Sequence, residues 1–120
     1  MVLVDTSIWI SHLREGNSHL EVLLNSGDVL YHPFIIGELA CGTLKNRDEL
    51  LSLFNSLPIA RIVEHDEVLK FIEKRNLMSM GLGYIDVHLL ASALLSDSPI
   101  WSLDKKLNKI AHDMDISFKC

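Results

Sequence analysis

Four acidic side chains stand apart from the other Asp and Glu residues because apolar sequence surrounds them. Asp5 ends a short apolar run, and Asp104 follows another. Glu38 lies among apolar neighbours in a helical pattern, and Asp86 follows a glycine-rich loop. Carboxylates gathered in a partly apolar cleft repel one another, and a divalent cation relieves that repulsion. Oxygen ligands without thiolates or several imidazoles suit Mg²⁺ or Mn²⁺, so the pattern predicts a metal site.

A simpler explanation is open for three of the four. Asp5, Asp86 and Asp104 each stand near an expected helix start, where a carboxylate can cap the helix and favour its dipole. Glu38 is harder to explain in this way because it lies about one turn inside its helix. The pattern alone leaves capping and metal binding as alternatives.

The elements that must position these residues are short strands alternating with amphipathic helices. Strands are expected at 2–4, 29–31, 59–63, 99–102 and 116–118. The first helix is expected to begin with Thr6 or Ser7 as its cap and to stop near Gly16, and the second to end at Ser26. Two later helices are expected to begin at Pro33 and at Asp66, and three more to cover 46–57, 84–95 and 104–114. This alternation predicts a three-layer α/β domain with a largely parallel sheet. In such a sheet the carboxyl ends of the strands lie at one edge, so the four acids are expected to meet there.

Composition limits the remaining possibilities. The chain has 120 residues, which fits a single domain over 1–120, and its net charge of −5 argues against a simple electrostatic nucleic-acid binder. We expect no membrane span and no signal peptide. Cys41 and Cys120 form no metal or disulfide motif, which is compatible with a reducing cytoplasm; we expect Cys41 to be a small apolar filler and Cys120 a terminal thiol.

Several other residues are interpreted as structural. The six histidines contain no metal-binding pair, and His88 should point away from Asp86 because positions two apart face different sides of a helix. Trp9 and Trp101 lie in apolar runs and are expected in the core. The same is expected of residues at helical spacing, namely Leu50, Leu53, Phe54, Leu57, Phe71 and Ile72.

Four segments resemble the motifs of PIN-domain nucleases, in that family's order and approximate spacing. They are Val2–Ile10, Ile36–Leu39, Ile85–Ala93 and Trp101–Leu107. Over essentially its full length the chain resembles the VapC toxins of type II toxin–antitoxin pairs. The resemblance implies a PIN-like three-layer α/β/α sandwich and an endoribonuclease that depends on Mg²⁺ or Mn²⁺ and leaves a 5′-phosphate. It also implies a cytoplasmic homodimer that a VapB-like antitoxin neutralises.

The resemblance also implies roles for individual residues. Asp5, Glu38, Asp86 and Asp104 match the family's catalytic and metal-binding acids, with Glu38 either a ligand or the base that takes the water proton. The hydroxyl residues Thr6, Ser7 and Ser102 match supporting positions, and Ser102 is expected to orient a carboxylate. Val87-His88 and Lys105-Lys106 depart from the commoner family pattern. The lysine pair leaves the choice of substrate open, because Lys cannot form the bidentate contacts of the Arg that is common there.

Positive charge follows the last of these acids. Lys105, Lys106 and Lys109 are candidate RNA contacts, although a solvated helix face would explain them equally well. The four site acids account for most of the net charge of −5, so the acidity that argued against nucleic acid is largely the expected metal cradle.

Two alternatives to a nuclease stay open. A phospho-receiver-like signalling domain fits the length and the Asp after the first strand, but it would need a paired acid and a phosphoacceptor that are not evident. A catalytically inactive PIN-like binding module is disfavoured by the intact acid set. A serine or cysteine hydrolase has little support because there is no GxSxG motif.

Overall fold

A small parallel sheet is the centre of the computed structural model, which describes residues 1–119. Its strands are β1 (Val2–Val4), β2 (Val29–Leu30) and β3 (Ile100–Trp101), in the order β2-β1-β3. In register, Leu3 lies opposite Leu30 on one side and Ile100 on the other. All of these strand residues are buried, as is typical of parallel strands that are covered on both faces.

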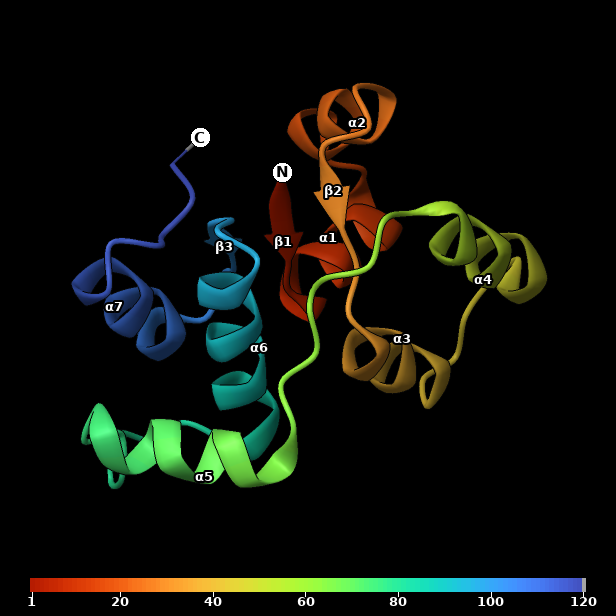
Figure 1. Ribbon diagram of the computed structural model, residues 1–120. Coiled ribbons are helices and arrows are strands. Elements are labelled where there is room, and N and C mark those ends of the chain that lie inside the picture. The colour runs from red at the N-terminus through yellow and green to blue at the C-terminus, as the bar shows by residue number, and fades with distance from the viewer. Residues whose placement is uncertain (120) are drawn as a thin grey trace.

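Helices cover the sheet on both sides (Figure 1). They are α1 (Thr6–Glu15), α2 (Ser18–Asn25), α3 (Pro33–Ala40), α4 (Arg47–Ser56), α5 (His65–Lys74), α6 (Tyr84–Leu95) and α7 (Lys105–Asp113). In the view of Figure 1, α6 and α7 lie on one side of the strands and α1 to α4 on the other, while α5 packs on α6. The predicted α/β class with a parallel sheet is confirmed.

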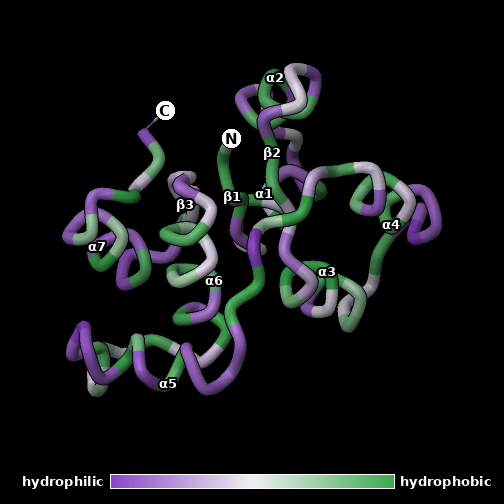
Figure 2. Tube along the Cα trace, viewed as in Figure 1, coloured by the Kyte–Doolittle hydropathy of each residue, from purple (hydrophilic) through white to green (hydrophobic). Residues whose placement is uncertain are grey.

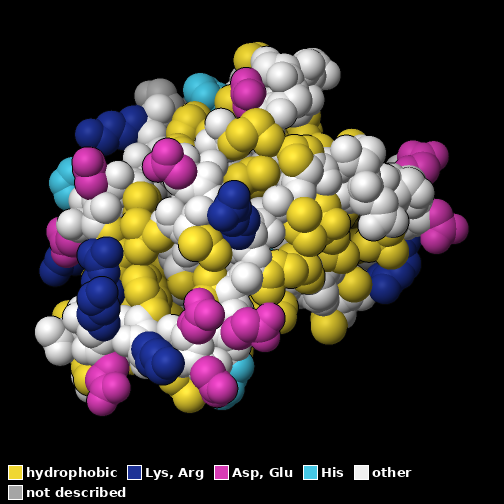
Figure 3. All heavy atoms as spheres, viewed as in Figure 1, with side chains coloured by type: hydrophobic (Ala, Val, Ile, Leu, Met, Phe, Trp, Pro, Cys, Tyr) yellow, Lys and Arg dark blue, Asp and Glu magenta, His cyan; other side chains and the backbone are white. Residues whose placement is uncertain are grey.

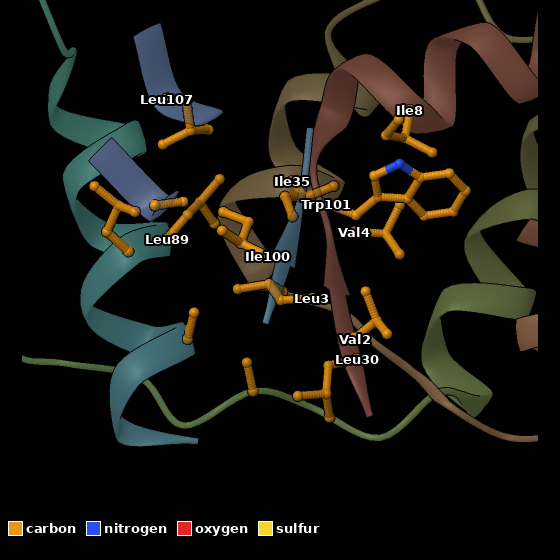
Figure 4. Packing of buried hydrophobic residues seen from close by; sticks show 14 of the residues in the cluster. Val2, Leu3, Val4, Ile8, Leu30, Ile35, Leu89, Ile100, Trp101 and Leu107 are labelled. Carbon is orange, nitrogen blue, oxygen red and sulfur yellow. The ribbon is translucent and has the colours of Figure 1, made fainter. Parts of the chain in front are cut away.

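The core fills the spaces between these layers. Leu3 points toward α6, whereas Val2 and Val4 point to the opposite face, as alternation along a strand requires (Figure 4). The central helix α6 is buried continuously from Val87 to Ala93, so it behaves as a core helix and not as an amphipathic surface helix. Figure 2 shows that hydrophobic residues predominate in the central strand β1, whereas hydrophilic residues predominate in the outer helix α5.

Two of the five predicted strands are wrong as strands. The segment 59–63 makes a single bridge, Tyr31 to Ile59, and then leaves the sheet, where Arg61 N–H bonds to the Ser96 hydroxyl. The segment 116–118 likewise makes one bridge, Ser117 to Ile100. Each segment exchanges backbone hydrogen bonds with only one residue, Tyr31 directly after β2 or Ile100 in β3, which is too short a pairing to form a ladder.

Some local predictions also need correction. Asp5, and not Thr6 or Ser7, occupies the N-cap position of α1, since the helix already begins at Thr6. Leu53 is exposed on α4, while Leu50 and Phe54 are buried as predicted. Cys41 is exposed at the end of α3, so it is not a core filler, and the prediction for Cys120 lies outside the described residues.

Other structural predictions hold. Both tryptophans, Trp9 and Trp101, are buried in the core. Leu57, Phe71 and Ile72 are partly buried against it. Across residues 1–119, no helix is long and apolar enough to cross a membrane.

Candidate active site

The carboxylate of Asp5 lies at the carboxyl end of the central strand and is almost fully buried, with 7% of the residue exposed. Its Oδ2 accepts two hydrogen bonds, from the Ser7 hydroxyl at 2.8 Å and from the Ser102 hydroxyl at 2.7 Å. Although Asp5 stands at the N-cap position of α1, its side chain makes no capping bond to the described backbone. The Asp5 carboxylate is thus held by two side-chain hydroxyls and not by the backbone N–H groups of α1.

The two hydroxyls are themselves fixed by backbone N–H groups that follow β3. Leu103 N–H donates to Ser7 Oγ at 2.9 Å, and Asp104 N–H donates to Ser102 Oγ at 3.0 Å. Each hydroxyl therefore accepts from the backbone and donates to the carboxylate, which strengthens both bonds. The network ties the ends of β1 and β3 together around one buried negative charge.

Glu38 approaches the same edge from α3. Its Oε1 accepts a hydrogen bond of 2.7 Å from the hydroxyl of Thr6, the residue after Asp5. This contact crosses between α1 and α3, which pack against each other. Glu38 is exposed despite its apolar neighbours in the sequence, because it occupies the outer face of α3.

Asp86 is the third residue of α6 and is half-buried. Its Oδ2 accepts the Gly83 N–H at 3.1 Å, which closes the turn before the helix. Burial raises the pKa of the Asp86 carboxyl, the Gly83 hydrogen bond opposes this, and the negative charges of Asp5 and Asp104 raise the pKa further. The carboxylates of Asp5 and Asp104 therefore both lie close enough to Asp86 to act on its charge.

Asp104 is exposed and caps α7. Its Oδ1 accepts the N–H groups of Lys106 at 2.9 Å and Leu107 at 3.1 Å. The capping alternative therefore describes Asp104 and the Asp86–Gly83 contact, but not Asp5. Capping engages one oxygen of each carboxylate, so it does not exclude a second role for the other oxygen.

The site is assembled in part. Asp5, Asp86 and Asp104 share one electrostatic field, and Glu38 is linked to them through Thr6. Among the described side chains, no three His, Cys, Asp or Glu residues are close enough together to form a ready-made metal centre. A cation would have to draw these carboxylates together.

The model of the PIN domain family matches residues 2–113. The chain belongs to the PIN-domain family. The matched range contains all three strands of the sheet and all four site acids. The family resemblance inferred from the sequence is therefore confirmed.

Two curated relatives and one solved structure are similar to this PIN domain. Ribonuclease VapC32 of Mycobacterium tuberculosis, from strains CDC 1551 and H37Rv, is 44% identical over 108 residues, covering 89% of this chain and 87% of the relative. The crystal structure of PAE2754 from Pyrobaculum aerophilum superposes with a TM-score of 0.62 at 18% identity, covering 90% of this chain and 77% of that chain. The first comparison supports a VapC-type PIN domain, and the second supports the fold.

Sequence reasoning missed several parts of this site. It assigned 81–83 only as a loop, whereas Gly83 N–H holds Asp86. It matched Ser7 to a supporting position without its particular role, which is to bond both Asp5 and the backbone of Leu103. An Asp-x-Ser spacing after an apolar strand is the signal that could have found the Ser7–Asp5 bond, because hydroxyls two residues on can reach such a carboxylate.

The PIN domain also has a second group of buried polar side chains, which we call the histidine pocket: His32, His88 and Ser92. His88 packs against Phe34 at 4.7 Å and Tyr84 at 4.5 Å between ring centroids, so it is turned away from Asp86. Within the part of the chain that is described, His32 Nε2, both His88 nitrogens and Ser92 Oγ have no hydrogen-bond partner. Burial, reinforced by His88, lowers the pKa of His32 to about 4, and burial also lowers the pKa of His88.

Charged side chains cluster on the surface as well. Figure 3 shows Lys, Arg, Asp and Glu side chains around most of the margin of one face, with a broad hydrophobic area near its centre. Lys105, Lys106 and Lys109 are exposed on the first turns of α7, directly after Asp104.

Proposed function

We propose that this PIN domain is an endoribonuclease that depends on Mg²⁺ or Mn²⁺, with Asp5, Glu38, Asp86 and Asp104 as its catalytic and metal-binding residues. The observation that carries the proposal is the buried Asp5 carboxylate, held through one oxygen by Ser7 and Ser102. Such an arrangement keeps a negative charge in place and leaves the second oxygen for a cation. The relatives named Ribonuclease VapC32 support RNA as the substrate.

The residues present fit a hard divalent cation. All four donors are carboxylates, and the pKa of Asp86 is raised first by burial and further by the negative charges of Asp5 and Asp104, which a bound cation would offset. A bound Mg²⁺ would lower the pKa of a water molecule and stabilise charge on the phosphodiester.

The chain's own residues would divide the remaining work. Ser7 and Ser102 hold Asp5, while Thr6 holds Glu38 at the exposed side of the site. From there Glu38 would serve either as a further ligand or as the base that takes a proton from the attacking water. Attack on phosphorus by water would leave a 5′-phosphate and a 3′-hydroxyl.

Positive charge beside the acids would attract RNA. Lys105, Lys106 and Lys109 follow Asp104 on α7, and we propose that they contact substrate phosphates. The contribution is sequence-independent, so it does not select a particular RNA.

We also propose that the protein is the toxin of a toxin–antitoxin pair, restrains growth or translation, works in the cytoplasm as a homodimer, and is neutralised by a VapB-like antitoxin. The VapC-type relatives support this. A groove of about 510 Å³ is lined by Glu38 together with Ile10, Leu13, Arg14 and Leu39 among others, and it is where we expect an antitoxin segment to bind. A basic side chain of such a segment would meet the site acids.

Cleavage of total RNA by the purified protein tests the nuclease proposal. Cleavage should require added Mg²⁺ or Mn²⁺, stop in EDTA and leave 5′-phosphate ends, and Asp86→Asn should cut orders of magnitude more slowly. An Asp86→Asn protein that cleaves at the wild-type rate would contradict the assignment of Asp86 to the active site. If the wild-type protein leaves RNA intact, the alternative of an inactive PIN-like binding module would be favoured. The match to the PIN domain family leaves the phospho-receiver alternative without support.

A further inference from the structure

The side chain of Asn108, in the first half of α7, reaches back to the end of the strand that precedes this helix. Its Nδ2 donates a hydrogen bond of 2.7 Å to the backbone carbonyl of Ser102. The backbone ladder between β1 and β3 ends just before this point, where Asp5 N–H donates to the Trp101 carbonyl at 2.9 Å. Asn108 therefore supplies the donor for the next carbonyl along the chain.

The carbonyl that Asn108 binds shares one peptide group with the N–H of Leu103. That N–H donates to Ser7 Oγ at 2.9 Å, and the Ser7 hydroxyl donates to Asp5 Oδ2 at 2.8 Å. Because a peptide group is planar, a rotation that breaks the bond to Asn108 also turns the N–H relative to Ser7. Hydrogen bonds in such a chain polarise and strengthen one another. A continuous chain of hydrogen bonds therefore runs from α7 to the buried carboxylate.

The helix that carries Asn108 is anchored in the core. Leu107 and Ala111 of the same helix are fully buried. The Asn108 N–H bonds to the Asp104 carbonyl at 2.9 Å, and the Asn108 residue itself is half-buried. The Asn108 amide is therefore presented from a part of the fold that the core holds in place.

We propose that Asn108 is a positioning residue of the active site, which acts through the 102–103 peptide to keep the Asp5 carboxylate oriented. By fixing this peptide, Asn108 fixes the hydroxyls of Ser7 and Ser102, which both bind Oδ2 of Asp5. The other oxygen of Asp5 is then left in one orientation for a cation. The inference rests on the proposed metal-dependent function and deepens it, because it adds to the site a residue that acts only through others.

Solvent exchange of the Leu103 amide hydrogen, measured by nuclear magnetic resonance in the metal-free protein, tests the positioning itself. Asn108→Leu keeps a side chain of similar size but removes the donor. The Leu103 amide should then exchange about 5-fold faster than in the wild type, which corresponds to the loss of one hydrogen bond.

Asn17→Leu is the matched control for this measurement. Asn17 is also half-buried and also binds the backbone, since its Oδ1 accepts the Leu20 N–H at 3.0 Å. It follows the end of α1 that is farther from Asp5, about 15 Å away along the helix. Asn17→Leu should therefore leave the exchange of Leu103 unchanged.

Binding of Mn²⁺ and cleavage of RNA test the consequence for the site. Asn108→Leu should raise the Kd for Mn²⁺ about 10-fold, the low end of the loss typical of outer-shell residues. The Mn²⁺ concentration that gives half-maximal cleavage should rise by the same factor. The KM for RNA at saturating Mn²⁺ should stay unchanged, because Asn108 acts through Asp5. Asn17→Leu, a merely structural change, should move none of these values.

A double variant tests the route by which Asn108 acts. Because the chain of hydrogen bonds passes through Ser7, Asn108→Leu should cost less Mn²⁺ affinity in a Ser7→Ala background than in the wild type. If Asn108→Leu does not fold, Asn108→Ala, which introduces a better helix former, serves for the same measurements.

Three results would overturn the inference: unchanged Leu103 exchange in Asn108→Leu, an unchanged Kd for Mn²⁺ in that variant, or additive losses in the double variant. A wild-type protein that binds no Mn²⁺ and cuts no RNA would refute the proposed function instead. The exchange of Leu103 in the metal-free protein would then decide alone whether Asn108 positions this peptide.

Discussion

Two groups of buried polar side chains in this domain differ in how well their polar atoms are hydrogen-bonded. Around Asp5, the carboxylate accepts two hydroxyl hydrogen bonds, and both hydroxyls accept backbone N–H groups. In the histidine pocket, the described residues offer no partner to either nitrogen of His88 or to the Ser92 hydroxyl. Both groups are shielded from water, so the difference lies in the hydrogen bonds.

The difference shows where the fold retains charge. At Asp5, two hydroxyls donate hydrogen bonds to one carboxylate oxygen, which is the kind of contact that stabilises a negative charge. The histidines have no such support, so burial keeps them neutral, and the pKa of His32 falls to about 4. We infer that the Asp5 network exists to hold a negative charge and the histidine pocket to fill space between α3 and α6.

The largest effect is expected for Asp5→Asn. The amide oxygen can still accept from Ser7 and Ser102, so the melting temperature should change little. RNA cleavage should fall by more than the about 100-fold typical of losing an outer-shell partner, because the charge itself is lost. Rates in Mg²⁺ and thermal unfolding measure the two effects, and full Mg²⁺-dependent activity in Asp5→Asn would contradict the account.

The next largest effect separates the hydroxyls of the two groups. Ser102→Ala or Ser7→Ala should lower cleavage about 10- to 100-fold, since each removes a donor that orients Asp5. Ser92→Ala is the matched control, because it removes a buried hydroxyl that has no partner among the described residues. Its cleavage rate should equal that of the wild type, and equal losses in all three variants would break the comparison.

A stability effect is expected from His32 at acid pH. Its pKa is 6.5 when unfolded and about 4 when folded, so between these values the unfolded chain binds more protons. The free energy of unfolding should therefore fall as pH drops from about 6.5 to about 4, by up to roughly 3 kcal/mol. Urea unfolding at several pH values measures this.

His32→Asn provides the control for that measurement. His32 Nδ1 accepts the Phe34 N–H at the start of α3, and an Asn oxygen can accept the same bond without titrating. The pH dependence should be flatter in His32→Asn, and an unchanged slope would show that His32 is not buried neutral.

The smallest effect is a difference in stability at Asp104, whose carboxylate caps α7 and is also a proposed metal ligand. Asp104→Asn should keep the α7 cap and lose cleavage, whereas Asp104→Ala should lose cleavage and also about 1 kcal/mol of stability. Denaturant unfolding of the two variants gives the difference. Equal stability would mean that the cap contributes little.

Much of the site could be predicted because its signals are local in the sequence. Apolar surroundings pointed to Asp5, Glu38, Asp86 and Asp104 as candidates, and the order of four short motifs pointed to the same residues. The boundaries of α6 were predicted to the residue because Gly83 and Ser96 flank a continuous apolar pattern.

Features that depend on packing between distant segments could not be predicted. The His32–His88 pair forms only when α3 meets α6, and the Lys106–Gly81 contact only when α7 meets the loop before α6. The segments 59–63 and 116–118 look like strands because they contain apolar residues. Each pairs at a single point because the chain turns away, which no local pattern reveals.

Binding of Mn²⁺ to the wild-type and Asp5→Asn proteins, measured from the electron paramagnetic resonance signal of the free ion, tests the central claim most directly. We expect the wild-type protein to remove Mn²⁺ from solution and Mg²⁺ to compete for the same site, whereas Asp5→Asn should bind far more weakly while staying folded. Equal Mn²⁺ binding by the two proteins would contradict the assignment of the Asp5 carboxylate as the centre of the metal site.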